Sequence, residues 1–312
     1  MKVYRGLDHD FSISRPVVTP GTFDGVHIGH RKIIERIRLK AYEIGGESVV
    51  LTFEPHPRLV LFPDDNQLRL LTSLDEKLHL LEQAGVDHVV VIPFDREFSR
   101  LTATAYVENI LVNRLHTQCL VIGYDHQFGR NREGSIEQLQ KLAPQFGFEV
   151  EEIPPQDIDD IKVSSTKIRN ALLSGDIETA NTFLTYTYNF EGKVVKGNQI
   201  GRTLGYPTAN IQPSDSLKLI PGIGIYAVQV VIGNEMRGGM MSIGKRPTVE
   251  DTEHITIEVH VFDWSEDLYD QRIRIHMVEK MRNEEKYNSL DELKQQLMLD
   301  EKQARELLKE TA

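Results

Sequence analysis

The order of the secondary-structure signals along the chain is the feature that most constrains its fold. In the first half, short β-type runs alternate with amphipathic helical segments. Arg15–Thr19 and Ser48–Phe53 are expected strands, with a helix from about His30 to Ile44 between them. Strands separated by helices of ten or more residues predict βαβ units, and therefore a parallel sheet. Sheets of this kind bind ligands beyond the carboxyl ends of their strands.

The alternation continues to about residue 185 and then stops. The further strands expected in the first half are His88–Ile92, Cys119–Ile122 and Phe148–Ile153, and the further helices are Ser73–Gln83, Thr102–Arg114, Ser135–Gln145, Ser165–Ser174 and Asp176–Leu184. Residues 189–280 instead contain β-branched stretches broken by glycine and proline, which predicts a compact antiparallel barrel. A final helix is expected over Ser289–Lys309. The predicted fold class is α/β followed by β, with domains at 1–185 and 186–312.

Composition excludes several classes of protein. The chain has 312 residues, of which 40% are hydrophobic and 27% charged, so intrinsic disorder is not expected. No apolar run approaches the ~20 residues of a membrane helix, and the first residues lack the apolar core of a signal peptide. The one cysteine, Cys119, excludes a disulfide framework within the chain and predicts a reducing cytoplasm. A net charge of −11 argues against general binding to nucleic acid or anionic membranes.

The loop predicted after the first strand has an unusual sequence, Gly21-Thr-Phe-Asp-Gly-Val-His-Ile-Gly-His30. Its glycines permit positive φ and close approach to a ligand, and the helix N-terminus that follows offers free N–H groups to an anion. His27 and His30 are three apart, so both can lie on one side of the first helical turn. They can donate hydrogen bonds to the charge that develops on a pentacoordinate α-phosphorus. The phosphate-binding residues expected in this loop are Gly21, Phe23, Asp24 and Gly29.

Two histidines at this spacing can also merely cap a helix or bind a stray metal ion. The full ten-residue string favours the phosphate site, because a simple turn needs neither three glycines nor both histidines. A second segment, Lys162-Val-Ser-Ser-Thr-Lys-Ile-Arg169, is predicted between the fifth strand and a helix. Its serines and threonine are N-cap types, and its basic residues add charge. Beside the histidine loop, Ser165, Thr166, Lys167 and Arg169 are interpreted as a clamp on the leaving pyrophosphate.

A second candidate site lies in the β-rich half, which has no Walker A loop and no protein-kinase glycine loop. The segment Gly201-Arg-Thr-Leu-Gly-Tyr-Pro-Thr-Ala-Asn-Ile211 joins a glycine-punctuated loop to oxygen donors at Thr208 and Asn210. Side chains two apart share a face in an extended segment, and hard oxygens are the ligands that Mg²⁺ prefers. Glu258, on the polar face of the predicted strand Ile255–Phe262, is a candidate general base. The alternatives are a turn that closes a strand and a solvated carboxylate.

These motifs carry a resemblance to a known family. GTFDGVHIGH (21–30) with SSTKIR (164–169) resembles the HxGH nucleotidylyltransferase superfamily. More narrowly, it is similar to the Rossmann-like adenylyltransferase module of bacterial bifunctional riboflavin kinase/FAD synthetases, of which TFEPHP (52–57) and GYDHQFG (123–129) match further blocks. In the second half, PTAN (207–210), SIGKRPTV (242–249), IEVHVFDW (257–264) and MRNEEKY (281–287) fall in the order of riboflavin kinase barrels.

The resemblance implies an enzyme with two activities. The barrel would transfer the γ-phosphate of ATP to the 5′-hydroxyl of riboflavin, and the N-terminal domain would transfer AMP from a second ATP to FMN, releasing pyrophosphate and FAD. It implies Thr208 and Asn210 as Mg–ATP ligands, with Gly201 in the same ATP-binding loop, and Glu258 as the catalytic base. The other implied site residues are Asp125 and Phe128 at the nucleotide or flavin site of the first domain, and Arg282 beside the flavin of the second.

Other classes of function stay open. One is a transferase for another phosphate acceptor, with the barrel as an accessory domain. Another is a flavin-binding regulatory protein without turnover, against which the intact His27, His30, Asn210 and Glu258 argue. A nucleic-acid role has the weakest support, because the chain is acidic and shows no basic stripe. The expected partners are the small molecules riboflavin, FMN and ATP, with Mg²⁺ as cofactor and with no nucleic acid or membrane; the oligomeric state is left open.

Overall fold

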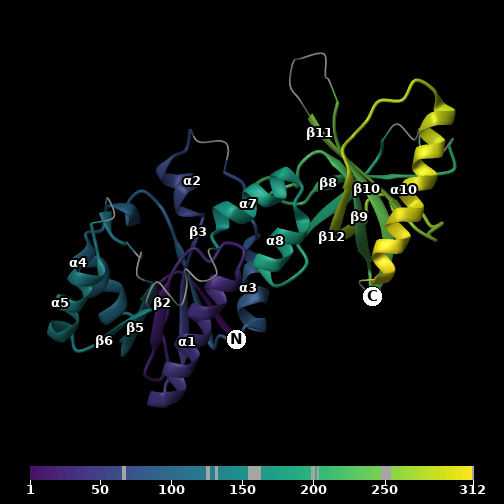
Figure 1. The fold of residues 1–312 in the computed structure, drawn as a ribbon. Helices are drawn as coiled ribbons and strands as arrows, with labels where there is room; N and C mark the ends of the chain where they lie inside the picture. Colours follow the sequence, from purple (N-terminus) through teal and green to yellow (C-terminus); the bar gives the residue numbers. More distant parts are fainter. Residues whose placement is uncertain are drawn as a thin grey trace. The chain divides into compact units, whose positions relative to one another are not determined.

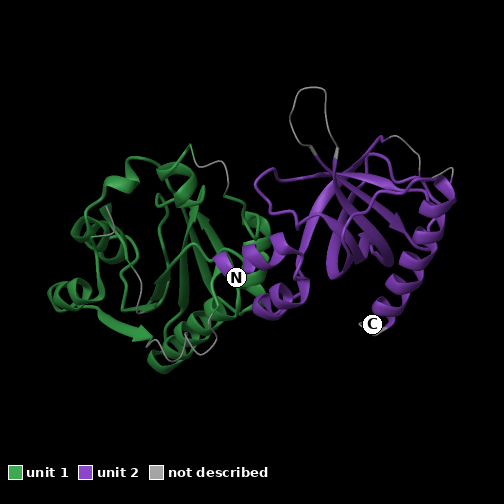
Figure 2. Ribbon diagram, turned by 45° about the horizontal axis from the view of Figure 1, so that its top comes forward, with its two compact units in different colours: residues 1–165 green, residues 166–312 purple. Residues whose placement is uncertain are grey.

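The chain forms two compact units, residues 1–165 and 166–312 (Figures 1 and 2). The structure is a computed structural model, and it describes residues 1–64, 68–123, 127–130, 133–153, 163–197, 201, 204–246 and 254–310. Among these residues no helix is both long and apolar enough to cross a membrane.

The first unit is built on a six-stranded parallel sheet, as the alternating pattern predicts. Its strands are β1 (Lys2–Arg5), β2 (Val17–Pro20), β3 (Ser48–Glu54), β4 (His88–Pro93), β5 (Cys119–Gly123) and β6 (Glu149–Ile153), in the spatial order β1-β4-β3-β2-β5-β6. Two details differ from the sequence-based expectation. The edge strand β1, paired with β4, was not expected, and β2 starts two residues later than predicted because Arg15 has a positive φ of 41°.

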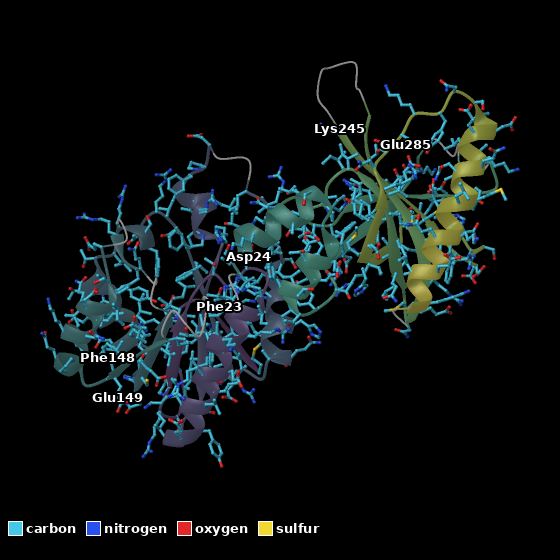
Figure 3. The ribbon with its side chains drawn as sticks, in the orientation of Figure 1. Phe23, Asp24, Phe148, Glu149, Lys245 and Glu285 are labelled. Atoms are coloured by element: carbon cyan, nitrogen blue, oxygen red, sulfur yellow. The ribbon has the colours of Figure 1, made fainter. Side chains whose placement is uncertain are left out.

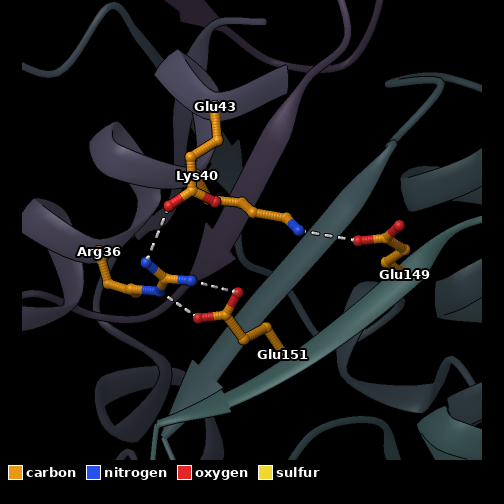
Figure 4. Close-up of polar contacts among 5 residues, drawn as sticks. All are labelled: Arg36, Lys40, Glu43, Glu149 and Glu151. Atoms are coloured by element: carbon orange, nitrogen blue, oxygen red, sulfur yellow. Dashed lines mark hydrogen bonds and ion pairs between the residues drawn. The ribbon is translucent and has the colours of Figure 1, made fainter. Parts of the chain in front are cut away.

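The helices of the first unit are α1 (Ile28–Ile44), α2 (Pro57–Leu61), α3 (Leu74–Gln83), α4 (Ala103–Tyr106) and α5 (Ile136–Phe146). The helix predicted from Thr102 does begin there, with the Thr102 side chain as N-cap, but it continues beyond α4 as a π-helical segment, Val107–Val112. Ion pairs join α1 to β6, where Lys40 Nζ lies 2.9 Å from a Glu149 carboxylate oxygen and Arg36 contacts Glu151 (Figure 4).

The strand order places a topological switch point between β2 and β5. The chain moves from β2 through β3 to β4 on one side, and then returns to add β5 and β6 on the other. Parallel sheets bind ligands in the crevice outside the carboxyl ends of the two strands at such a point. The loop of residues 21–27, between β2 and α1, starts from this edge, and β5 ends there at Gly123.

The second unit is a closed antiparallel barrel, which confirms the predicted fold of this half. Two helices, α7 (Ser165–Ser174) and α8 (Ile177–Leu184), precede it. The strands are β7 (Asn189–Val195), β8 (Ala209–Pro213), β9 (Gly224–Ile232), β10 (Glu235–Arg246), β11 (His254–Val261) and β12 (Arg272–Arg282), closed in the order β10-β11-β8-β7-β12-β9. The final helix is α10 (Leu290–Glu310).

Helix α10 packs on the barrel strands β9, β10 and β12. Its apolar side chains meet a cluster that contains Tyr206, Ala227, Met240, Phe262 and Ala304. Strict alternation along the predicted strand 255–262 would put Phe262 on the polar face with Glu258, but Phe262 is buried in this cluster. It would also put Ile255 on the opposite, apolar face, but Ile255 is 56% exposed. Glycine at 238 permits the approach, since a Cβ there would lie 2.9 Å from a Leu308 methyl.

Cys119, the one cysteine of the sequence, lies buried in β5 and is unpaired. Burial is the main reason why its pKa is raised to about 11. A thiol with so high a pKa is a poor nucleophile at neutral pH.

Candidate active sites

The histidine loop combines a helix cap with a ring stack. His27 is the N-cap of α1, and its Nδ1 accepts a hydrogen bond from the His30 backbone N–H at 3.4 Å. The acceptor role of Nδ1 leaves the ring proton of His27 on Nε2. The His27 and His30 rings are stacked with centroids 3.7 Å apart, and the Phe23 ring lies against His30 at 5.0 Å. Capping, the simpler alternative, therefore accounts for His27 but not for His30.

His30 is held as a neutral imidazole. Burial, the His27 ring and the ammonium of Lys77, in that order, keep the pKa of His30 well below its ordinary value of 6.5. Its Nδ1 is buried and has no hydrogen-bond partner among the described residues. Buried polar atoms are nearly always hydrogen-bonded, so an exception in a loop of this kind points to an absent partner.

The backbone of this loop is strained. Phe23 and Val26 have φ of 48° and 39°, beside Gly25 at 84°. A positive φ is a genuine outlier for a β-branched residue such as valine, and strain of this kind gathers at ligand-binding and active sites. Of the three glycines, positive φ is found at Gly25 alone; a Cβ at Gly21 would instead lie 2.8 Å from the Phe23 ring.

The carboxylate of Asp24 fixes this strained segment. It is 3% exposed and accepts hydrogen bonds from the backbone N–H groups of Leu71 and Thr72 at 3.0–3.1 Å. Thr72 also uses its hydroxyl, which accepts from the Gly25 N–H at 3.1 Å. Phe23 and Asp24 thus hold the loop in shape at the end of β2 (Figure 3). The predicted contact of Asp24 with ATP stays a prediction.

An aromatic cluster joins rings from β3, from the segment after β4, from α4 and from the segment 127–130. The rings of Phe53, Phe94 and Phe98 are in mutual contact at 5.5–5.9 Å, Phe98 meets Tyr106 at 6.3 Å, and Tyr106 meets Phe128 at 5.6 Å. Sequence reasoning named Phe128 in this cluster and missed the other four residues. The Tyr106 hydroxyl is buried without a partner among the described residues, and burial raises its pKa. Asp125 and His126 lie outside the described residues.

The predicted pyrophosphate clamp begins where the first unit ends. The hydroxyl of Ser165 donates a hydrogen bond to the Asp24 backbone carbonyl at 3.1 Å, which ties the start of α7 to the histidine loop. Thr166, Lys167 and Arg169 follow in the first turns of α7, within the second unit. Lys162 lies outside the described residues.

In the barrel, the structure brings Thr208, Asn210 and Glu258 together. Asn210 on β8 is directly opposite Glu258 on β11, so the two side chains share a face of the sheet. The Thr208 hydroxyl donates a hydrogen bond to a Glu258 carboxylate oxygen at 3.1 Å. Ser242 on β10 is opposite Glu258 on its other side and adds a hydroxyl that sequence reasoning did not name as a site residue.

Neighbouring groups hold the segment before Asn210. His260, two residues after Glu258, binds the Pro207 carbonyl through Nδ1 at 2.8 Å. The carbonyl of Gly201 accepts hydrogen bonds from the N–H groups of Leu204 and Tyr206 at 3.1 and 2.8 Å, which hold these residues close to Gly201 just before β8. These hydrogen bonds fix the chain directly before Thr208 and Asn210, the predicted oxygen donors.

Arg282 is not adjacent to Glu258. β12 and β11 are three strands apart in the closed order, in either direction around the barrel. The Arg282 guanidinium forms two hydrogen bonds, of 2.8 and 2.6 Å, to the carboxylate of Asp300 on α10, and these bonds are the main cause of its raised pKa. Asp300 is 1% exposed and also accepts from Gln296 at 2.9 Å.

The two halves of the chain match two protein families. Residues 11–167 match the model for FAD synthetase, and residues 184–308 match the model for riboflavin kinase. The class of protein is therefore a nucleotidyltransferase joined to a kinase, both acting in flavin nucleotide synthesis.

Curated relatives match along the whole chain. The bifunctional riboflavin kinase/FMN adenylyltransferase of Haemophilus influenzae is 39% identical over 302 residues, covering 96% of this chain and 97% of that protein. The proteins of the same description from Escherichia coli K12 and Listeria monocytogenes are each 38% identical, covering 98% and 93% of this chain and 97% and 91% of theirs. The chain belongs to the family of bifunctional riboflavin kinase/FMN adenylyltransferases, as the motifs predict, and it is an enzyme with both activities.

A solved structure matches the entire fold. A Streptococcus pneumoniae protein described as a macrolide-efflux protein superposes with a TM-score of 0.88 at 31% identity, covering 98% of this chain and 99% of that one. The match supports the combination of parallel sheet and closed barrel within one chain.

Proposed function

We propose that the histidine loop is the site of adenylyl transfer from ATP to FMN. An oxygen of the FMN phosphate attacks the α-phosphorus of ATP, the new P–O bond forms in line, and the bond to the pyrophosphate oxygen breaks. His27 and His30 donate hydrogen bonds to the oxygens of the α-phosphate as negative charge develops there. The observation that carries this proposal is the stacked histidine pair at the switch point, with a buried His30 nitrogen that lacks a partner among the described residues.

The residues around the loop supply binding and orientation. Gly21 and Gly29 are proposed to lie beside the phosphates, whose charge the α1 N-terminus favours. Ser165 is proposed to hold the leaving pyrophosphate, which its hydrogen bond to the Asp24 carbonyl supports. Thr166, Lys167 and Arg169 are proposed for the same role from the sequence motif alone. The aromatic cluster that includes Phe128 offers ring faces on which the isoalloxazine of FMN can stack. Asp125, which lies outside the described residues, is proposed as a further contact of the nucleotide or flavin.

We propose the row of Thr208, Asn210 and Glu258 as the site of riboflavin phosphorylation. Glu258 accepts the proton of the 5′-hydroxyl as its oxygen attacks the γ-phosphorus of ATP. The hydrogen bond from Thr208 orients the Glu258 carboxylate, and it is the observation that carries this assignment. Gly201 belongs to the ATP-binding loop, and Arg282 is proposed to lie by the flavin at the far side of the barrel.

The donor set of the barrel site suits Mg²⁺. A hydroxyl and an amide oxygen beside a carboxylate are hard oxygen ligands, and Thr208 and Asn210 would hold the ion. When bound, Mg²⁺ neutralises phosphate charge. No group of three or more His, Cys, Asp and Glu side chains within the described residues is arranged to bind a metal ion. The proposed site would therefore draw its remaining ligands from ATP and water.

A complementation experiment tests both assignments at once. The variants His30→Ala and Glu258→Gln are each incubated with riboflavin, ATP and Mg²⁺, and then mixed, with products separated by chromatography. We expect FMN alone from the first variant, neither product from the second, and FAD from the mixture, because FMN made by one variant is adenylylated by the other. A mixture that fails to form FAD, although each variant keeps its other activity when assayed separately, would contradict two independent sites.

A further inference from the structure

Lys77 is a buried cation of the first unit that neither proposed reaction uses. It lies in α3, four residues after the N-cap Ser73, and is 5% exposed. Placing an ammonium group inside a protein costs free energy unless charges and hydrogen bonds compensate for it. Two carboxylates, those of Asp24 and Glu54, attract it; burial lowers the pKa of Lys77, and these two groups oppose the shift.

A chain of hydrogen bonds leads from Lys77 to the histidine loop. The ammonium donates to the Thr52 hydroxyl oxygen at 3.3 Å, and the Thr52 hydroxyl donates to the Thr22 carbonyl at 3.2 Å. Thr52 is fully buried near the end of β3. Hydrogen bonds in series polarise one another at a buried site, so the charge of Lys77 strengthens the contact that fixes the Thr22 carbonyl, directly before the strained residue Phe23.

The charge of Lys77 also acts on the ionisation of His30. Lys77 disfavours protonation of His30, together with burial and the His27 ring. The charged or titratable groups around this pair are His27, Asp24 and Glu54, and Arg31 follows His30 in the chain. A neutral His30 donates one hydrogen bond and carries no positive charge, whereas the Lys77 ammonium is held in the interior by two carboxylates and the Thr52 hydroxyl.

We propose that Lys77 is a positioning residue for adenylyl transfer, which holds the histidine loop through Thr52 and supplies a fixed positive charge beneath the His27–His30 pair. The proposal rests on the assignment of adenylyl transfer to this loop. Lys77 acts through Thr52 and through its field on His30 rather than by contact with the reacting atoms.

Lys77→Met is the principal test, because methionine keeps the length of the apolar stem and removes the charge. FAD formation from FMN and ATP is measured between pH 5 and 9, and the His30 pKa is measured by NMR of its ring protons. We expect a loss of about tenfold to 10²-fold in rate. We also expect the His30 pKa, and with it the acid limb of the rate profile, to rise, since a neighbouring positive charge has been removed. Lys77→Arg should restore the acid limb.

Two further variants separate the parts of the proposal. Thr52→Val cuts the hydrogen-bond chain and leaves the charge, so it should lower the rate without moving the acid limb. Lys40→Met is the matched control: it removes a lysine that pairs with Glu149, away from the loop (Figure 4), and should match the parent. If Lys77→Met does not fold, the rate of FAD formation by Thr52→Val decides whether the hydrogen-bond chain positions the loop.

Several results would overturn the proposal. One is a Lys77→Met variant in which the rate of FAD formation and the His30 pKa are both those of the parent. Another is a lowered rate with an unchanged His30 pKa, which would mean that Lys77 only packs in the interior. Parent activity in Thr52→Val would show that the hydrogen-bond chain does not position the loop. His30→Ala is run in parallel: if that variant makes FAD normally, the assignment of the loop itself is wrong, whereas loss in His30→Ala with no effect in Lys77→Met counts against Lys77 alone.

Discussion

The two proposed sites are positioned by different kinds of structure. In the first unit, a strained loop is held by partners far away in sequence, such as Leu71 and Thr72 on the Asp24 carboxylate. In the barrel, the register of neighbouring strands places Glu258 directly opposite Asn210 on one side and Ser242 on the other. A loop site can fail when one distant buried partner is removed, whereas a register site keeps its geometry as long as the barrel closes, because slipping by one residue would turn every side chain to the other face.

Glu258→Gln tests the barrel site and should have the largest effect of the changes considered. The glutamine keeps the size and the hydrogen bond to Thr208 but cannot accept a proton, so the register geometry survives while FMN formation falls by about 10²–10⁴-fold. FAD formation from supplied FMN should be unchanged. The matched control is Glu279→Gln, an exposed glutamate on β12. Product chromatography with riboflavin as substrate measures the effect, and kinase turnover near the parent rate would leave Glu258 as a solvated carboxylate.

His30→Ala is the equivalent change in the loop site. It removes a buried ring from a stack with His27 and Phe23, and loss of an electrostatic stabiliser of this kind typically costs about 10²–10³ in rate. FMN should accumulate, because the kinase site is separate. His79→Ala, at an exposed position on α3, is the control. An unchanged rate of FAD formation in His30→Ala would exclude the loop from adenylyl transfer.

Asp300→Ala tests whether the barrel site also depends on a distant partner. The change leaves the largely buried Arg282 guanidinium without its bidentate carboxylate, and breaking a buried ion pair costs about 3–5 kcal/mol of unfolding free energy. Trp264, the one tryptophan of the sequence, reports denaturant unfolding of the second unit by fluorescence. We expect KM for riboflavin to rise more than kcat falls. Equal stability to Glu306→Ala, an exposed position on the same helix, would contradict this view.

The smallest effect is expected from cutting the chain at residue 185. A fragment of residues 186–312 keeps every barrel strand and α10, so we expect it to fold and to phosphorylate riboflavin. It loses the Asn181 side chain, which donates to the Met277 carbonyl at 3.0 Å and accepts from the Tyr188 N–H at 2.7 Å. Each lost bond costs about 1 kcal/mol. A fragment of residues 166–312 is the control.

Activity in the longer fragment alone would place the domain boundary at the division between the compact units, 165/166, rather than at 185/186. The riboflavin kinase model begins at residue 184, which favours the later boundary. The boundary at 185/186 stays a prediction until these two fragments are compared.

Local pattern was sufficient for most of the fold. The parallel sheet follows from β-branched runs separated by helices, and caps such as Ser73, which forms a complete capping box with Glu76, mark helix starts that the structure confirms. The strands β1, β8 and β10 were not predicted. β1 is a short edge strand, and β10 contains Gly238, Gly239 and Gly244, which weaken a strand signal. In β10 the glycine at 238 makes room for a helix that arrives 50 or more residues later.

The site was predictable where the residues themselves carry the chemistry, as at His27, His30 and Glu258. It was not predictable where function depends on contacts between distant residues. Lys77 did leave a signal: it falls on the stripe of α3 that contains Leu80 and Leu81, both buried. A lysine at a core position of an amphipathic helix predicts a buried charge with partners that compensate for its burial. Sequence alone cannot show that the Thr52 hydroxyl accepts the hydrogen bond of this lysine.

The closed strand order has a consequence for substrate length. Since Glu258 and Arg282 stand on strands three steps apart in both directions, and neighbouring strands are about 4.8 Å apart, a ligand that contacts both has to extend across the mouth of the barrel. If Arg282 contacts the flavin and Glu258 the hydroxyl, as proposed, the barrel would discriminate by the length of the substrate as much as by its chemical groups. A flavin with a shortened ribityl chain would keep its ring contacts and still place its terminal hydroxyl too far from the carboxylate to be phosphorylated.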